Sequence, residues 1–341
     1  MSARPVVAAT RFETVFAGGI IVAVVAGIDE AGFGPMLGPL VVSGVAIEVP
    51  DDAIDRCLWK ALGRSCTSHR RRGDRRLLIA DSKVVYRPRG DFSPLERSVL
   101  VTLRAWGRGP RSWRELVRLL APETLPSLDG CPWYAGRDLA LPVSPMVGDL
   151  GTQANAFRRD AEESGVRMRG VYCEPLTAGT FNRLVRNTRN KSVVLLGLVW
   201  RVIDRILHDA PGQRVRIYVD RLGGRTHYAD ALRTAWQPRV LDVLEETPQR
   251  STYRLTIPKQ SWEVSFVTDG DARHFPVALA SLYSKYLREL SMRVMNAYWG
   301  ERVPGLRPTA GYVTDARRWL RDVEPWLARF SIPRDLLVRL R

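Results

Sequence analysis

Two adjacent carboxylates, Asp29 and Glu30, follow an apolar run at residues 20–28. The turn behind them is rich in small residues and contains Ala31, Gly32, Gly34 and Pro35. Neighbouring residues of a strand point to opposite faces of a sheet. The two acids can therefore converge on one point only if the strand ends there or if one of them acts from the turn. Such a pair at the end of a strand is typical of metal ligands.

Acids also follow two later strand-like segments. Asp220 ends an alternating segment that begins at residue 215, and Asp271 comes shortly after the segment 262–267. A single aspartate after a strand is more often a turn or cap residue than a ligand, and Asp220 alone would be interpreted in that way. In a sheet covered by helices, however, strand ends bring their residues into one crevice. The three segments together, in a basic chain, favour a metal site.

Mutual repulsion is the physical cost of such a site. Four carboxylates in one crevice repel one another by roughly 3 kcal/mol per pair at about 5 Å, so a cation has to compensate them. Oxygen ligands select hard ions, chiefly Mg²⁺ or Mn²⁺. Two such ions about 3.5–4 Å apart can activate a water molecule and stabilise the leaving oxygen of a phosphodiester. The catalytic and metal-binding candidates are Asp29, Glu30, Asp220 and Asp271.

Basic residues exceed acidic ones by a wide margin. The 341 residues include 52 lysines and arginines and 36 aspartates and glutamates, which gives a formal net charge of +16. Arginine offers paired donors that suit phosphate oxygens, so a nucleic-acid partner is the first interpretation. An arginine-rich proteome is the alternative. Hydrophobic residues make up 45% of the chain, which is enough for the core of one large or two ordinary domains.

The cysteines and the apolar segments indicate the cellular compartment of the protein. The four cysteines form no CxxC pair, so we expect a reducing compartment and no disulfides. The apolar stretch 15–28 is too short and too rich in glycine for a membrane span, and it lacks a signal-peptide cleavage pattern. We therefore expect a cytoplasmic monomer with no membrane association and no protein partner.

Periodicity predicts most of the regular elements. Strands are expected at 20–28, 40–49, 166–172, 215–220, 240–244, 253–257 and 262–267, and helices at 53–63, 113–120, 177–187, 191–208, 226–236, 276–299 and 315–330. The long helix 276–299 should expose a face that carries Ser281, Lys285 and Arg288. Eight prolines interrupt the pattern between 84 and 165, so this part is interpreted as an inserted subregion.

Several motifs together resemble those of the type 2 ribonucleases H. Residues 27–35, GIDEAGFGP, followed by Gly38-Pro39, resemble the signature of that family, and Asp81-Ser82-Lys83 is similar to its next motif. The later pieces occur in the family's order: Tyr218-Val219-Asp220, then Gly270-Asp271 with the segment 280–288, then Gly311-Tyr312-Val313-Thr314. The resemblance covers residues 20–83 and 166–315 in pieces.

The resemblance implies an α/β, RNase H-like fold with a central mixed β-sheet flanked by helices, an insertion and a C-terminal helical extension. The implied organisation is a tail at 1–19, a catalytic domain at 20–300 that contains the subregion 84–165, and a helical substrate-contacting extension at 301–341.

The implied activity is metal-dependent cleavage of the RNA strand in RNA/DNA hybrids, or cleavage at a ribonucleotide embedded in duplex DNA. By this resemblance the four acids bind Mg²⁺ or Mn²⁺. The turn and the tyrosine motif meet the RNA, whose 2′-hydroxyl distinguishes it from DNA, through Gly32, Phe33, Gly34 and Tyr312. Phosphates are held by Lys83, Ser281, Lys285 and Arg288.

Other interpretations stay open. Phe33 stands where the family usually has arginine, which leaves room for an RNase H-like nuclease that acts on another DNA or RNA structure. A hybrid-binding protein that does not cleave is the third hypothesis. His274 could lie near the metals or serve the start of a helix, and the tryptophans at 106, 113 and 133 could be core residues or stacking platforms. The spacing of the glycines and the adjacent acids exclude a dinucleotide fingerprint.

Overall fold

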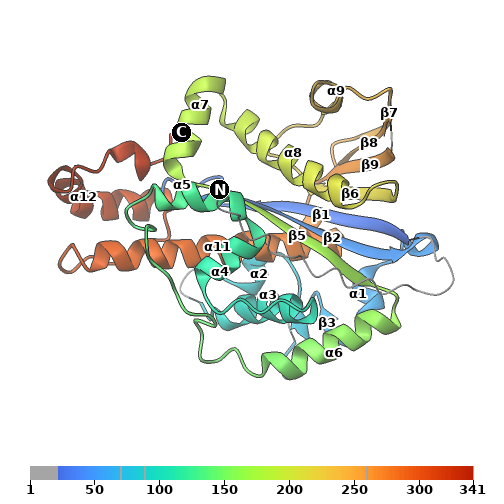
Figure 1. The fold of residues 1–341 in the computed structure, drawn as a ribbon, viewed down its shortest axis with the longest axis horizontal. Coiled ribbons are helices and arrows are strands. Elements are labelled where there is room, and N and C mark those ends of the chain that lie inside the picture. Colours follow the sequence, from blue (N-terminus) through green and yellow to red (C-terminus); the bar gives the residue numbers. More distant parts are fainter. Residues whose placement is uncertain (1–21, 70, 88–89, 259, 341) are drawn as a thin grey trace, which may run out of the picture.

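A sheet of seven strands with helices on both faces forms the centre of the protein (Figure 1). The computed structural model describes residues 22–69, 71–87, 90–258 and 260–340, so the predicted tail 1–19 lies outside the described residues. The strand order is β5-β2-β1-β6-β9-β8-β7. The strands are β1 (Val22–Ala31), β2 (Leu40–Pro50), β5 (Arg167–Leu176), β6 (Arg214–Asp220), β7 (Val240–Glu246), β8 (Arg250–Ile257) and β9 (Gln260–Val267).

The sheet is mixed, as predicted. β1 pairs antiparallel with β2, and β2 pairs antiparallel with β5. On its other side β1 runs parallel to β6, and β6 runs parallel to β9. β8 and β7 then continue the sheet in antiparallel fashion. Because β1, β6 and β9 are parallel, their carboxyl ends meet at one edge of the sheet.

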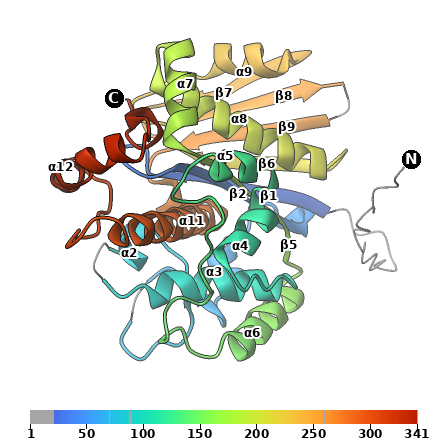
Figure 2. The same ribbon diagram turned by 60° about the vertical axis from the view of Figure 1, so that its left-hand side comes forward.

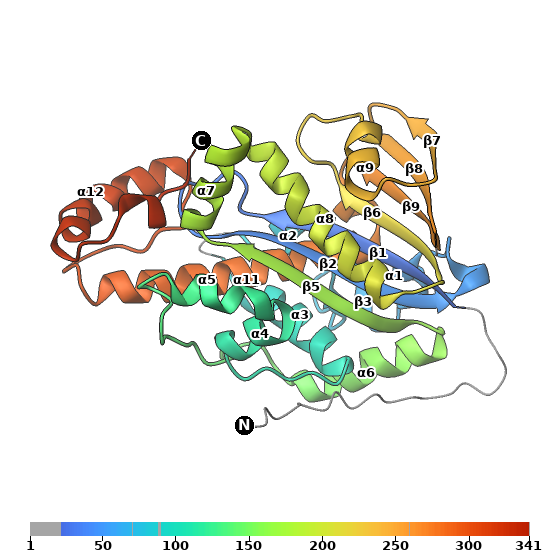
Figure 3. The same ribbon diagram turned by 45° about the horizontal axis from the view of Figure 1, so that its top comes forward.

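Two helical layers cover the sheet, one on each face (Figures 2 and 3). One layer contains α7 (Ala178–Thr188), α8 (Lys191–Asp209) and α9 (Ala229–Trp236). The other contains α3 (Ser93–Ala105), α4 (Trp113–Leu120), α6 (Leu150–Glu163) and α11 (Phe275–Gly300). In β1, Val24, Ala26 and Ile28 belong to the core under α8, whereas Ala23 and Val25 belong to the core around α11. Strands buried on both faces are almost continuously apolar, which explains why the run before Asp29 lacks alternation.

The helix α11 lies directly against β1. A Cβ atom added to Gly27 would sit 2.1 Å from the backbone nitrogen of Val277, so only glycine permits this approach. The prediction that this helix exposes a face with Ser281, Lys285 and Arg288 is wrong, because these residues are only 2%, 7% and 1% exposed. The reason is tertiary: this face of α11 packs against the end of β1, the turn at Gly32, Tyr86 and the carbonyl oxygen of Ala310.

The region 84–165 is more helical than predicted. Besides the predicted helix at 113–120, it forms α3, α5 (Leu125–Asp129) and α6. Pro94 and Pro126 occupy first-turn positions of α3 and α5, where proline starts a helix instead of breaking it. Trp113 and Trp133 are buried core residues.

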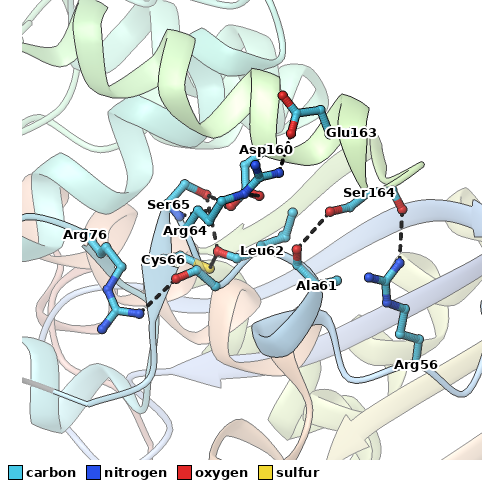
Figure 4. A network of polar contacts seen from close by, with 11 residues as sticks. Arg56, Ala61, Leu62, Arg64, Ser65, Cys66, Arg76, Asp160, Glu163 and Ser164 are labelled. Atoms are coloured by element: carbon cyan, nitrogen blue, oxygen red, sulfur yellow. Dashed lines mark hydrogen bonds and ion pairs between the residues drawn. The ribbon is translucent and has the colours of Figure 1, made fainter.

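A polar network ties α6 to the connection that follows β2 (Figure 4). The buried carboxylate of Asp160 accepts hydrogen bonds from the backbone nitrogen of Ser65 (2.9 Å) and from its hydroxyl (2.7 Å). Arg64 Nε donates to the same carboxylate at 3.2 Å, and its guanidinium also pairs with Glu163. The network joins region 84–165 to residues 64–65 on the same face of the sheet.

The remaining elements are short or peripheral. They are α1 (Leu58–Ala61), α2 (Ser82–Val85), α10 (Gly270–Arg273), α12 (Val313–Arg329) and the small pair β3 (Cys66–Thr67) and β4 (Leu77–Leu78). The predicted helix 53–63 is reduced to α1 and a 3-10 turn at Asp51–Ala53. All four cysteines are free. Among the described helices, none combines the length and the apolar character that crossing a membrane requires.

Candidate functional site

Three of the four predicted acids lie at the edge of the sheet where the parallel strands end. The parallel pairing of β1 with β6 stops at Ile28 and Val219. Asp29 and Glu30 extend past it, although both remain paired with β2. Asp220 is the last residue of β6. The adjacent carboxylates therefore occupy the final positions of β1, where β6 no longer flanks the strand.

Asp29 is buried on the face of the sheet that α11 covers. The hydroxyl of Ser284 donates to its backbone carbonyl at 2.9 Å, and Ser281 hydrogen-bonds to its carboxylate. Burial raises the pKa of Asp29 well above its ordinary value, and the negative charges of Glu30 and Asp220 raise it further. Two serines of α11 thus hold Asp29 in place, one at its backbone and one at a carboxylate that is costly to ionise.

Glu30 is the next residue of β1, so its side chain leaves the strand toward the opposite face of the sheet. Its backbone nitrogen donates to Asp29 Oδ1 at 2.7 Å. Its own Oε2 atom is buried and has no hydrogen-bond partner. Burial, followed by the charge of Asp220, raises the pKa of Glu30 to about 7, while Lys83 opposes the shift. A buried carboxylate oxygen without a partner is an acceptor that a cation could satisfy.

Asp220 and Asp271 are joined through the start of α10. The backbone nitrogen of Gly270 donates to Asp220 Oδ1 at 2.8 Å. Asp269 precedes this glycine in a left-handed conformation (φ 53°), which turns the chain sharply after β9. Burial raises the pKa of Asp271 to about 7, with Asp81 and then Asp220 adding to the effect. The turn after β9 therefore brings the fourth acid to the other three.

Lys83 faces the acids from α2. Its ammonium pKa is raised, first by Asp81 and then by Asp271, Asp29 and Asp220. Asp81 caps α2 by accepting a hydrogen bond from the backbone nitrogen of Lys83 at 2.8 Å. The charge of Asp81 also raises the pKa of Asp271 more than any other charge does. Sequence reasoning missed this second role, although the position of Asp81 beside Lys83 was a usable signal.

The donor set suits a hard divalent cation, but the side chains are not gathered into a closed site. In the described part of the chain, no three histidine, cysteine, aspartate or glutamate side chains form a group that could hold a metal ion as they stand. The charge of Asp220 nevertheless raises the pKa values of Asp29, Glu30 and Asp271, and Glu30 Oε2 is unpartnered. A divalent cation would relieve both conditions by drawing the carboxylates together.

The glycine turn beside the acids has a fixed shape. Gly32 has φ 92°, and a Cβ atom there would lie 2.6 Å from Arg288 Nε. Gly34, in contrast, faces open space. Phe33 is half-buried against the core under α8, and Lys191 Nζ lies 5.2 Å from the centre of its ring. The turn thus presents one open glycine and one aromatic ring beside a cation.

Arg339, near the end of the chain, supports this turn from inside. Its side chain is only 3% exposed, and Nη2 donates to the carbonyl oxygens of Gly32 and Pro35. A trans peptide group directs its N–H opposite to its carbonyl, so the amide of Phe33 points away from Arg339. Sequence reasoning missed Arg339, because nothing in the residues around it links it to a turn three hundred positions earlier.

The predicted phosphate-binding residues of α11 are buried in ion pairs and hydrogen bonds. Lys285 pairs with Glu289 at 3.0 Å. Arg288 lies 3.3 Å from the same carboxylate and donates to the carbonyl oxygen of Ala310 at 2.9 Å. These side chains brace the walls of the site. Tyr312 is exposed, at 46%, with the Arg288 guanidinium 5.7 Å from its ring centre, and the predicted contacts Gly34 and Lys83 are exposed as well.

His274 lies at the cap position before α11 and stacks on Tyr218, with 3.7 Å between the ring centres. Burial, then the charge of Arg250, lowers its pKa to about 4. The imidazole is therefore neutral near pH 7, and His274 serves the start of the helix through its backbone carbonyl, which accepts from the amides of Val277 and Ala278.

Comparison with protein-family models and with curated proteins gives no match. The structure is similar to RNase HII of Archaeoglobus fulgidus, solved in complex with PCNA (18% identity, 93% of this chain, 94% of that chain, TM-score 0.44). It is also similar to ribonuclease H2 of Pyrococcus horikoshii OT3 (13% identity, 92% of this chain, 92% of that chain, TM-score 0.43). A further similar structure is Bst-RNase HIII in complex with Mn²⁺ (15% identity, 94% of this chain, 67% of that chain, TM-score 0.44). At this level of similarity, a functional assignment rests on the residues of the chain itself.

Proposed function

We propose that this protein is a metal-dependent endonuclease that hydrolyses the RNA strand of RNA/DNA hybrids or cleaves at a ribonucleotide embedded in duplex DNA. One observation supports the proposal most: four carboxylates from three distant segments act on one another at the edge where β1 and β6 end. The motifs around these acids resemble those of the type 2 ribonucleases H. The net charge of +16 suits a polyanionic substrate.

The proposed ligands of Mg²⁺ or Mn²⁺ are Asp29, Glu30, Asp220 and Asp271. When bound, the ions would activate water for attack on a phosphodiester and neutralise charge on the leaving oxygen. The chain's own residues prepare that chemistry.

Hydrogen bonds from the chain orient two of these acids. Ser281 and Ser284 orient the carboxylate and the backbone of Asp29, and the Gly270 amide orients Asp220. Lys83, which already faces the acids, is placed to bind a phosphate oxygen that approaches them.

Recognition of the RNA is assigned to the glycine turn and to Tyr312. The backbone N–H groups of Gly32 and Gly34 would donate hydrogen bonds to the 2′-hydroxyl oxygen, the group that distinguishes RNA from DNA. Arg339 holds two carbonyl oxygens of the turn inward, so the amide that follows Gly32 points outward. The exposed ring of Tyr312 offers a stacking surface beside the turn.

A second candidate is an RNase H-like nuclease that acts on another DNA or RNA structure. The observation that favours it is Phe33, an aromatic ring in the centre of the turn. A ring at this position can stack on a base or sugar, whereas it cannot donate hydrogen bonds to a backbone. This candidate predicts cleavage of a substrate without an RNA–DNA junction.

The test is a cleavage assay with Mg²⁺ or Mn²⁺ on three duplexes in parallel: one with a single embedded ribonucleotide, one RNA/DNA hybrid and one of DNA alone. We expect cleavage of the first two. Asp29→Asn should lose at least about a hundredfold in rate, since it removes a ligand, whereas Glu162→Gln on the exposed surface of α6 should keep full activity. No cleavage of either RNA-containing duplex would contradict the proposed activity. Cleavage of branched DNA would then support the second candidate, and metal-dependent binding without any cleavage would support a non-cleaving hybrid-binding protein.

A further inference from the structure

A basic corner joins α7 to α8. It consists of Arg183, Arg186, Arg189 and Lys191. Residues 175–203 contain no aspartate or glutamate, although a stretch of that length would hold roughly three at the average frequency of this chain. The positive charge of the corner is therefore a local feature and does not merely repeat the basic composition of the whole chain.

The corner is exposed, and most of its charge is uncompensated. α7 ends at Thr188, Arg189 adopts a left-handed conformation (φ 54°), and Asn190 caps the start of α8. Every residue from 186 to 193 is exposed. Within the described residues, neither Arg189 nor Lys191 forms an ion pair, and of the four cations only Arg186 does, with Asp335. Exposed cations without carboxylate partners are free to bind an external anion.

The corner adjoins the proposed site through Phe33. The Lys191 ammonium lies 5.2 Å from the ring centre of Phe33, and Phe33 belongs to the turn that follows the acids Asp29 and Glu30. A second link runs through the end of the chain. The Asn182 side chain donates to the carbonyl oxygen of Val338 at 2.8 Å, next to the arginine that supports the turn. Figure 3 shows α7 beside this C-terminal segment.

We propose that the basic corner binds the phosphodiester backbone of a nucleic-acid strand where that strand leaves the glycine turn. The identity of the ligand as a nucleic acid rests on the proposed function. Arg183 and Arg186 lie three positions apart on α7, and hence on one side of the helix, so the cations form a track and not a single point. Phe33 offers a flat face to a base or sugar while Lys191 reaches the adjacent phosphate.

Charge reversal tests the proposal, with a matched control on the other helical layer. The test variant is Arg189→Glu with Lys191→Glu. The control is Arg118→Glu with Arg159→Glu, which changes the net charge equally at exposed arginines of α4 and α6 that form no ion pair within the described residues. Binding to a labelled RNA/DNA hybrid and to a DNA duplex is measured by fluorescence anisotropy in EDTA, at several salt concentrations.

We expect the test variant to bind both duplexes at least about tenfold more weakly near 0.1 M salt. A plot of the logarithm of its binding constant against the logarithm of the salt concentration should be less steep by about two units, since each lost phosphate contact removes about 0.9 from the magnitude of the slope. The control should keep the slope of the unmodified protein. The single variant Lys191→Arg, in which Arg189 is unchanged, should bind as tightly as the unmodified protein, because it keeps the positive charge. Equal weakening of both double variants would overturn the proposal, as would an unchanged slope in a test variant that unfolds at the normal temperature.

The binding assay needs neither metal nor cleavage, so its failure is distinct from failure of the proposed function. Weaker binding of the test variant in a protein that cleaves no RNA would support the corner and remove the nuclease. Normal binding and a normal KM of the test variant, in a protein that cleaves hybrids as proposed, would support the nuclease and remove the corner.

Discussion

Replacing Glu30 with glutamine should stabilise the metal-free protein. Burial raises the pKa of Glu30 from its ordinary value of 4.5 to about 7, and each tenfold change in proton affinity is worth about 1.4 kcal/mol. Ionising Glu30 at about pH 8 therefore costs the folded state up to about 3 kcal/mol. Glutamine is uncharged and of similar size, so the variant avoids this cost. Because Glu30 is coupled to Asp29 and Asp220, we expect a gain of about 1–3 kcal/mol.

The sign of this effect depends on pH. The folded pKa is raised, so the contribution of Glu30 to stability is fully present below about pH 4.5 and is lost as the pH rises through about 7. The difference between variant and unmodified protein should accordingly be largest at about pH 8 and should vanish near pH 4.5. Saturating Mg²⁺ should reverse the order, since bound metal stabilises only the protein that keeps its ligand.

Urea unfolding followed by circular dichroism, in EDTA and at several pH values, measures the effect. Glu263→Gln is the control: Glu263 accepts hydrogen bonds from Arg216 and Arg254, so its replacement should lower stability at about pH 8. Equal unfolding free energies of Glu30→Gln and the unmodified protein across this pH range would refute the reasoning, because Glu30 would then ionise in the fold without cost.

Three further predictions concern the support of the site. Gly27→Ala should lower the free energy of unfolding by about 3 kcal/mol, because its Cβ would sit 2.1 Å from the backbone of α11; urea unfolding measures it, and an unchanged midpoint would contradict the packing described. Arg339→Met should raise KM for a hybrid more than it lowers kcat, since it releases the turn and spares the acids, with Arg339→Lys intermediate; a loss confined to kcat would argue against this role. Mn²⁺ affinity, measured by calorimetry, should fall steeply below about pH 7 as Glu30 and Asp271 take up protons, and a flat profile between about pH 5 and 8 would exclude these acids as ligands.

The sequence predicted the centre of the fold because that part is governed by local patterns. The apolar runs of β1 and β2, the alternation of β6 and the first-turn proline of α11 each indicate their element directly. Carboxylates at strand ends gave the candidate acids in the same way. Parallel strands then bring residues two hundred positions apart to one edge of the sheet.

The sequence did not predict features that depend on tertiary packing. Prolines between 84 and 165 suggested irregular structure, yet Pro94 begins a buried helix. The polar residues of α11 suggested a solvated face, yet Lys285 lies against Tyr86, and Arg288 is enclosed by the turn at Gly32 and by Ala310. Arg339 acts on a turn at the other end of the chain, and no periodicity or motif encodes such a contact.

Titration of the protein with Mn²⁺, followed by electron paramagnetic resonance, tests the central claim most directly, because free and bound Mn²⁺ give different signals. If Asp29, Glu30, Asp220 and Asp271 hold the metal, the unmodified protein should bind Mn²⁺ tightly at about pH 8, and Asp29→Asn and Asp271→Asn should each weaken binding by about tenfold or more. Glu162→Gln should bind normally. Equal Mn²⁺ binding by the unmodified protein and both aspartate variants would contradict the assignment of the four acids as a metal site.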